Sequence, residues 1–364
     1  MTDEQLDEFA AWERLTWETR ATSYARSITQ LTRGAAAALL DAAEVGAGTA
    51  LLDVATGPGV VGLSARRRGA EVVAVDQSES MVTLACAAGL DARRASADRL
   101  PFETGAFDAV VAGFLINHLP RPGEGVAELA RVSKAFVALS VWDTPDANPA
   151  LGLFGDVVQS VEIDHAVPPG PDSTLYADDA RLTSLLVAGG LDDIRISRVH
   201  WSLTVAPGPW FDAVATGTPR TGAVLAAASP EQRAKLRRRY IEAATASYGA
   251  ARGLVVLPAA AVVASGRSTA TGIRLAPSAA DDLAGTHLHG RIRRELRAAA
   301  SVEVGRGPTV VTEQAADAVG DAIALPSGID HQRPPAGPAR TSAALNPAPP
   351  PTTMQSQVVL ISSS

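Results

Sequence analysis

Short apolar runs alternate with segments of helical spacing from residue 50 to residue 264, and this alternation constrains the fold more than any other feature. The run ALLDVA (50–55) is almost entirely apolar, which is typical of a parallel strand buried on both faces. After a tight glycine turn, VVGLSARRRG (60–69) has the apolar spacing of a helix. The runs of the strand type, of which 91–96 is the weakest, occupy 50–55, 71–76, 91–96, 107–113, 134–142, 193–205 and 254–264. We therefore predict an α/β fold: a doubly wound, seven-stranded, mostly parallel sheet with helices on both faces and a final antiparallel strand.

Aromatic residues divide the chain into two parts. After Tyr248 the sequence has no Phe, Tyr or Trp, and large aromatic side chains supply much of the apolar area that a core buries. The stretch 332–353 is rich in Pro, Ala and Thr, a composition typical of extended, solvated chain. We predict one domain over 1–265, with a helical N-terminal cap at 1–45 and a helical insert at 206–250, followed by a low-complexity, disordered tail at 266–364.

Composition and charge exclude several classes of protein. A single cysteine, Cys86, excludes a disulfide framework and any multi-cysteine metal site, and we expect no metal. The formal charge of −7 argues against a general nucleic-acid binder. The N-terminus is acidic where a signal peptide would be basic, and the longest apolar run contains Pro258 and is too short to span a bilayer. We expect a cytoplasmic protein without a membrane span; a homodimer is compatible with the sequence.

The glycine turn after the first strand carries the most specific chemical signal. Gly57, Gly59 and Gly62 form G-x-G-x-x-G between a strand and a helix, and Asp76 ends the second strand, where it could accept hydrogen bonds from two ribose hydroxyls. Both features suit NAD and S-adenosylmethionine. Asp53 favours the second, because a carboxylate beside the glycine turn would repel a pyrophosphate. S-adenosylmethionine instead carries an ammonium and a sulfonium group.

Four motifs, in order along the chain, resemble those of one family. DVATGPG (53–59) resembles the first motif of class I S-adenosylmethionine-dependent methyltransferases, particularly the ubiquinone/menaquinone-methylase-like (methyltransferase type 11) branch. VVAVDQS (72–78), the segment 95–114 and LVAGGLDDIRI (186–196) are similar to later motifs of the same Rossmann-like methyltransferase fold. The resemblance implies S-adenosyl-L-methionine as cofactor, with Asp98 at the adenine amino group and the backbone of Ala97 near the ring.

The resemblance and the placement of these motifs give a set of candidate cofactor-binding residues. They come from the first helix, the glycine turn, the second strand and the loops after the third and fourth strands: Tyr24, Asp53, Ala55, Gly57, Gly59, Asp76, Gln77, Met81, Ala97, Asp98 and Phe114. Met81 could pack on the adenine and Tyr24 could close over the cofactor, while a role in the core is an equal alternative for both.

His118 follows the fourth strand, at the edge where open α/β sheets bind ligands, and is the candidate catalytic base. The alternative is a loop residue that only shapes the pocket. Four aromatic side chains, Trp142, Trp201, Trp210 and Phe211, are candidates for lining a partly apolar acceptor pocket, and a role in the core is the alternative for them. These features predict an enzyme (EC 2.1.1.-) that methylates a small molecule such as a natural product or a quinone-like compound. A non-catalytic S-adenosylmethionine-binding subunit of a biosynthetic complex is the alternative, and the methylated atom (oxygen, nitrogen or carbon) is left open.

Overall fold

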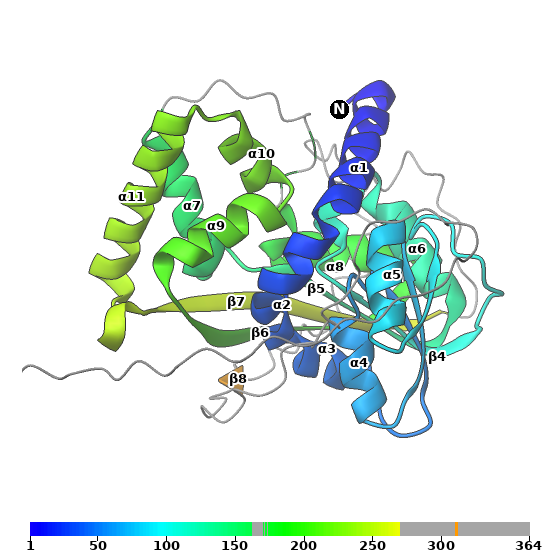
Figure 1. Cartoon of the computed structure of the whole chain (residues 1–364). Helices are drawn as coiled ribbons and strands as arrows, with labels where there is room; N and C mark the ends of the chain where they lie inside the picture. Colours follow the sequence, from blue (N-terminus) through cyan, green and yellow to red (C-terminus); the bar gives the residue numbers. More distant parts are fainter. Residues whose placement is uncertain (162–169, 171, 173, 270–309, 312–364) are drawn as a thin grey trace, which may run out of the picture. The chain divides into compact units, whose positions relative to one another are not determined.

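A computed structural model describes residues 1–161, 170, 172, 174–269 and 310–311, all within a unit that extends from Met1 to Ala318 (Figure 1). Its centre is one sheet of strand order β3-β2-β1-β4-β5-β7-β6-β8. The strands are β1 (Ala50–Val54), β2 (Glu71–Asp76), β3 (Asp91–Arg94), β4 (Phe107–Gly113), β5 (Ser133–Trp142), β6 (Leu191–Val205), β7 (Val255–Ser268) and β8 (Val310–Val311).

The strand directions confirm the predicted seven-stranded sheet. Strands β1 to β5 pair in parallel, whereas β7 pairs antiparallel with both β5 and β6. The two-residue strand β8, which pairs in parallel with β6, was not predicted. It lies within the segment 266–364 that the sequence assigns to a tail, and most of that segment lies outside the described residues. Strand β7 continues to Ser268, beyond the expected end of the fold at residue 265.

The helices in the described part of the chain are α1 (Asp3–Ser27), α2 (Thr29–Thr32), α3 (Ala36–Ala42), α4 (Val60–Arg67), α5 (Glu79–Ala87), α6 (Pro122–Val132), α7 (Pro149–Gln159), α8 (Asp179–Ala188), α9 (Pro207–Gly217), α10 (Arg220–Ala227) and α11 (Pro230–Tyr248). Their starts follow local capping chemistry. Thr2 and Gln5 form a capping box before α1, Ser229 and Gln232 form another before α11, and Ser78 Oγ accepts a hydrogen bond from the Met81 backbone at the start of α5.

Alternate side chains along the strands supply two separate cores, one on each face of the sheet. In β1, Leu52 packs with the side of the sheet covered by α6 and α8, whereas Leu51 packs with the side covered by α3 and α4. This alternation is the period-two geometry of a strand, and it explains why the strand runs are apolar throughout. The doubly wound arrangement predicted from the sequence is therefore confirmed.

Helices α7, α9 and α11 form a third core beside β7 (Figure 1). Phe154, Phe211 and Tyr240 stack within it, and Trp210 Nε1 donates to the carbonyl of Ala150 at 3.0 Å. The prediction that Trp210 and Phe211 line the acceptor pocket is wrong, because both are buried in this core. Helix α7 was not predicted, because the other helices were recognised between successive strand runs and no strand run follows α7 directly.

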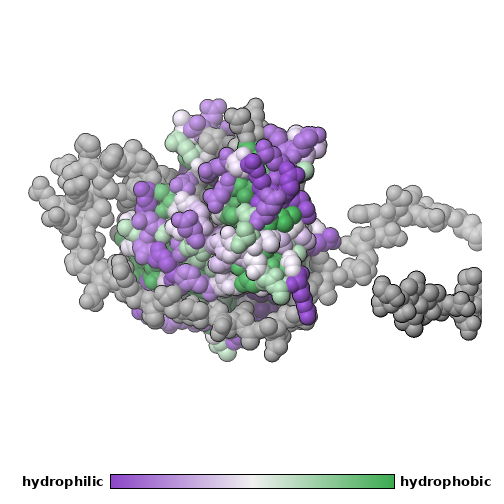
Figure 2. All heavy atoms as spheres, turned by 90° about the vertical axis from the view of Figure 1, so that its left-hand side faces the viewer, coloured by the Kyte–Doolittle hydropathy of each residue, from purple (hydrophilic) through white to green (hydrophobic). Residues whose placement is uncertain are grey.

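The surface above this third core is largely hydrophilic. Figure 2 faces the end of the unit that carries α7 and α11, where hydrophilic side chains surround small apolar spots. On α11, Arg237 pairs with Asp212 at 3.0 Å and Arg239 donates to the carbonyl of Ser160. Two arginines of the Arg237–Arg239 run thus brace α11 against its neighbours. Within the described ranges, no helix combines the length and the apolar character needed to cross a membrane.

Candidate cofactor and acceptor site

A cavity with a volume of about 490 Å³ lies at the carboxyl ends of the parallel strands. Residues that directly follow β1, β2, β3, β4 and β5 line it, as expected for ligand sites of open α/β sheets. Helix α1 and the segment between α9 and α10 close it from the other side. A smaller neighbouring cavity of about 40 Å³ lies against the glycine turn.

Two non-glycine residues at this edge adopt a left-handed backbone. Ala55 follows β1 with φ 55° and Phe114 follows β4 with φ 57°. Such conformations are uncommon for residues with a Cβ and gather at functional sites. Gly59 (φ 96°) is needed for packing as well, because a Cβ there would lie 2.7 Å from Leu90 Cδ1. The chain is therefore held in an unusual path at the strand ends that line the cavity.

Asp76 fixes the glycine turn. Its Oδ2 accepts a hydrogen bond from the Gly57 backbone at 2.9 Å, and its Oδ1 accepts one from the Ser78 backbone at 2.9 Å. Burial raises the pKa of Asp76 to about 6, against the lowering effect of these hydrogen bonds. Each carboxylate oxygen keeps a lone pair, so the residue can accept further hydrogen bonds from a ligand in the cavity.

Asp53 is almost completely buried beneath the same turn and lines the smaller cavity. Its Oδ2 accepts hydrogen bonds from Thr56 Oγ1 at 2.6 Å and from the Gly62 backbone at 2.8 Å. Burial raises its pKa to about 7, and the nearby charge of Asp76 adds to this rise. Asp53 therefore holds the turn and the first turn of α4 together.

Helix α1 contributes a carboxylate that the sequence analysis missed. Glu18 accepts hydrogen bonds from Ser78 Oγ at 2.7 Å and from Ser80 Oγ at 2.5 Å. The hydrogen bond from the Ser80 hydroxyl has the largest effect on the pKa of Glu18 and lowers it; burial raises the pKa, and the bond from Ser78 lowers it further, so that the pKa lies below its usual value. No local pattern marks this residue, because its partners lie about 60 positions away along the chain. Tyr24, also on α1, packs edge-on against Trp17. Burial raises the pKa of the Tyr24 hydroxyl to about 12.

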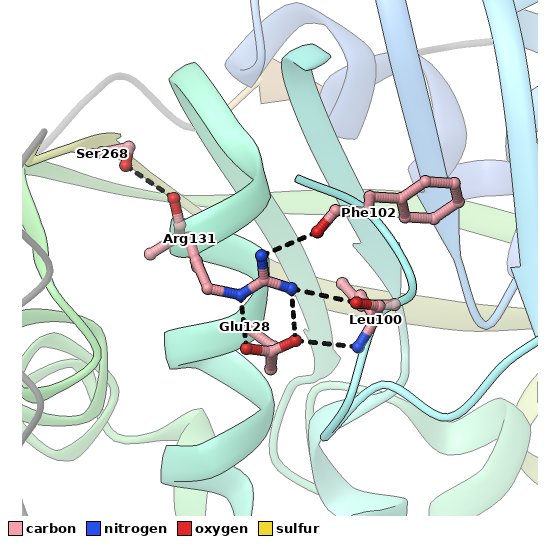
Figure 3. Close-up of polar contacts among 6 residues, drawn as sticks. Leu100, Phe102, Glu128, Arg131 and Ser268 are labelled. Atoms are coloured by element: carbon pink, nitrogen blue, oxygen red, sulfur yellow. Dashed lines mark hydrogen bonds and ion pairs between the residues drawn. The ribbon is translucent and has the colours of Figure 1, made fainter. Parts of the chain in front are cut away.

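The loop between β3 and β4 is held by an ion pair on α6 (Figure 3). Glu128 accepts a hydrogen bond from the Leu100 backbone at 2.8 Å and pairs with Arg131 at 2.7 Å. Arg131 in turn donates to the carbonyls of Phe102 at 2.7 Å and Leu100 at 3.0 Å. This loop also carries Ala97, which lines the cavity, so the pair on α6 fixes one of its walls.

An Arg131→Met variant should loosen that wall. Methionine keeps much of the side-chain length but removes the donors to two loop carbonyls, and charge-assisted hydrogen bonds of this kind contribute about 1.5–3 kcal/mol. We expect a lower unfolding temperature and faster amide hydrogen exchange at 97–102. Arg93→Met is the matched control, because Arg93 pairs with Asp91 on the exposed surface of β3. Equal exchange rates in the two variants would contradict this role.

The other end of the cavity combines aromatic and polar side chains. The rings of Phe114 and Trp142 stack with centroids 3.9 Å apart, and both residues line the cavity. His118 lines it as well, with Nδ1 3.1 Å from a carboxylate oxygen of the buried Glu13. Other polar side chains that line it include Asp143, Asn148 and Arg220. The cavity thus has one end beside the glycine turn and another where an aromatic wall lies among polar side chains.

Comparisons with known proteins agree with this architecture. A family model described as "Methyltransferase domain" matches residues 52–136. A demethylmenaquinone methyltransferase of Mycolicibacterium vanbaalenii is 30% identical over 159 residues, which cover 40% of this chain and 69% of that protein. The chain belongs to the class I S-adenosylmethionine-dependent methyltransferase family. The resemblance stated from the sequence motifs is confirmed.

Two further relatives match over a smaller share of their length, and one solved structure has a similar fold. A ubiquinone biosynthesis O-methyltransferase of Hahella chejuensis is 35% identical over 117 residues, 30% of this chain and 49% of that protein. An uncharacterized protein of Mycobacterium tuberculosis is 32% identical over 166 residues, and this chain spans only 58% of its length. A putative methyltransferase from an antibiotic biosynthesis pathway of Anabaena variabilis is 16% identical with a TM-score of 0.46, over 64% of this chain and 98% of that one.

Most candidate residues of the methyltransferase site are brought together by the fold. Those that line the larger cavity are Tyr24, Ala55, Gly57, Asp76, Gln77, Met81, Ala97, Phe114 and His118. Asp53 lines the smaller cavity, whereas Gly59 and Asp98 line neither. Asp98 is exposed to solvent, so its assignment to the adenine stays a prediction without support from the geometry. Of the four aromatic residues predicted for the acceptor pocket, Trp142 alone lines the cavity.

Metal chemistry has no visible site in the described ranges. Among those residues, no group of three or more His, Cys, Asp or Glu side chains could hold a metal ion. His165, His287 and His289 lie outside them.

Proposed function

We propose that this chain transfers a methyl group from S-adenosylmethionine to a small, partly aromatic acceptor, a natural product or quinone-like compound. The observation that carries the proposal is one cavity of about 490 Å³ that runs from the Asp76–Gly57 turn to His118 and Trp142. Such a cavity is large enough for two ligands to meet, which a methyl transfer requires. We also infer a cytoplasmic location.

The residues at the glycine turn suit the parts of the cofactor. Asp76 has free lone pairs for the two ribose hydroxyls, and Met81 and Ala97 line the same cavity and would contact the adenine. Ala55 and Gly57 line both cavities and would hold the methionine portion, with Asp53 beneath them. S-adenosylmethionine supplies a methyl group that its sulfonium has already activated. The protein therefore needs mainly to align donor and acceptor, and orientation alone can supply an effective molarity of about 10⁵–10⁸ M.

The acceptor end suits a flat ring. The Phe114–Trp142 stack provides an aromatic wall, and Leu115, Leu119 and Leu151 provide apolar surface. The names of the relatives, a ubiquinone biosynthesis O-methyltransferase and a demethylmenaquinone methyltransferase, support a quinone-like ring. His118 is the group we propose as a base wherever the acceptor must lose a proton; such a base contributes about 10²–10⁴-fold in rate.

Calorimetric titration with S-adenosylhomocysteine, with NAD as the control ligand, tests the cofactor. We expect binding in the micromolar range and none with NAD, because the buried Asp53 beside the glycine turn disfavours a pyrophosphate. Incubation with S-adenosylmethionine and a panel of hydroxylated naphthoquinones and phenols, read by mass spectrometry, tests catalysis. A folded chain that binds NAD, or that binds neither ligand, would refute the proposal. Cofactor binding without turnover of any panel member would favour the non-catalytic alternative.

A further inference from the structure

A buried carboxylate on α1 holds the candidate base. Glu13 is 1% exposed, and its two oxygens lie 3.1 Å and 3.2 Å from Nδ1 of His118, which lies 105 positions further along the chain. The indole of Trp17 meets the imidazole edge-on with centroids 5.1 Å apart. Among the described residues, Nε2 has no hydrogen-bond partner, and the His118 side chain lines the cavity. The ring is therefore fixed through one nitrogen while the other is left for a ligand.

Glu13 has a cationic side chain near it as well as His118. A carboxylate so deeply buried is costly unless it is paired. Arg220 on α10 supplies a nearby positive charge: burial lowers the pKa of this guanidinium, whereas the charges of Glu13 and Asp172 raise it. The guanidinium also lies 5.1 Å from the centroid of the Phe9 ring, which leaves it close to α1.

The placement of the Glu13 oxygens indicates which ring nitrogen of His118 carries the proton. Both oxygens lie near the same nitrogen, at 3.1 Å and 3.2 Å, which is the geometry of one N–H group pointing between two acceptor oxygens. With the proton on Nδ1, a neutral imidazole has its lone pair on Nε2. In free histidine the opposite tautomer, with the proton on Nε2, predominates. The contact between α1 and the His118 loop thus selects the minor tautomer of the free side chain.

We propose that Glu13 is a positioning residue that holds His118 with Nε2 as the proton acceptor, so that the chain methylates a hydroxyl group of its aromatic acceptor. This inference rests on the proposed function. The acceptor O–H proton moves to Nε2 while an oxygen lone pair forms the new O–CH₃ bond. The C–S bond breaks with its electron pair going to sulfur, which yields S-adenosylhomocysteine. His118 then releases the proton to water.

The tautomer can be measured without an acceptor. Long-range ¹H–¹⁵N NMR spectra of the full ¹⁵N-histidine-labelled chain at neutral pH report the protonated nitrogen of each of the six histidines, and His118→Gln assigns the signal of interest. We expect the Nδ1–H form in the wild type and a shift to the Nε2–H form in Glu13→Leu. Glu8→Leu, an exposed glutamate of the same helix, is the matched control and should leave the spectrum unchanged.

An Nε2–H signal in the wild type overturns the proposal, and this measurement does not depend on whether Glu13→Leu folds. Retention of Nδ1–H in a folded Glu13→Leu chain also overturns it. In the acceptor screen, a product methylated on oxygen supports the hydroxyl assignment and a product methylated on carbon contradicts it. Failure of the wild type to bind S-adenosylhomocysteine would instead refute the proposed function, whatever the tautomer of His118.

Discussion

An Asp76→Ala variant is expected to bind S-adenosylhomocysteine at least about 100-fold more weakly than the wild-type chain. The carboxylate at the end of β2 is the group that we propose to accept hydrogen bonds from both ribose hydroxyls. Hydrogen bonds to a charged group contribute about 1.5–3 kcal/mol each, and about 2.7 kcal/mol corresponds to 100-fold. The same substitution removes the acceptor for the Gly57 and Ser78 backbones, so the turn itself loses its anchor. Calorimetric titration measures the loss.

Two further variants separate binding from folding. Glu79→Ala removes an exposed negative charge three positions along the chain, outside the cavity, and should bind as the wild type does. Asp76→Asn keeps one oxygen acceptor and should lie between the wild type and Asp76→Ala. Thermal unfolding of each variant shows whether the chain is folded under the titration conditions. Wild-type affinity in a folded Asp76→Ala chain would remove Asp76 from the site.

The sheet could be predicted from the sequence because buried parallel strands leave a local signal. The segments 71–76 and 107–113 are bounded in the structure as the apolar runs predict, since both faces of these strands are covered. The glycine turn was equally accessible, because the positive φ of Gly57 and the close packing at Gly59 demand glycine locally. Strand burial and the backbone conformation of a turn each restrict the residue types over a few consecutive positions, so both can be recognised from the sequence.

The polar contacts of the site depend on long-range packing and left no such signal. Glu13 and Glu18 read as ordinary charged positions of an amphipathic helix, yet they bind His118 and the start of α5. The prediction for Trp210 and Phe211 failed for the same reason. The sequence does not distinguish an aromatic residue that lines a pocket from one that is buried in a separate core, because the difference depends on how the helices pack. Residues that act through tertiary contacts therefore require the structure.

Cofactor affinity is expected to fall at least about tenfold when the pH is lowered from about 7.5 to about 5. Burial raises the pKa of Asp76 to about 6 and that of Asp53 to about 7, so both free carboxyls take up protons across this interval. A ligand that needs the carboxylates must displace those protons, and each group lowers the affinity by up to about tenfold per pH unit below its pKa. Titrations in buffers of different ionisation enthalpy measure the protons released.

Asp53→Asn tests the share of this effect that belongs to Asp53. The amide oxygen can still accept from Thr56 and Gly62, so the turn keeps its shape while the titrating group is gone. The pH dependence of affinity should become shallower. Asp108→Asn is the control, because Asp108 lies at the opposite end of the strands and its hydrogen bonds from the Ala50 backbone and Lys134 lower its pKa. A pH profile equally steep in Asp53→Asn and in the wild type would contradict the assignment.

The free energy of unfolding should depend on Asp53 in the opposite direction from cofactor affinity: affinity rises with pH, whereas the contribution of Asp53 to stability falls. Because the folded-state pKa of Asp53 is raised, its burial costs nothing below the pKa of the unfolded chain, near 3.8, and the cost grows until the pH passes about 7. The contribution of Asp53 to the free energy of unfolding should therefore fall over this window, by an amount on the order of 4 kcal/mol. Asp53→Asn should flatten that decline in urea unfolding curves recorded across the window. If the free energy of unfolding of Asp53→Asn fell with pH as much as that of the wild type, the pH dependence would come from other carboxyl groups, and burying the ionised Asp53 would have no cost.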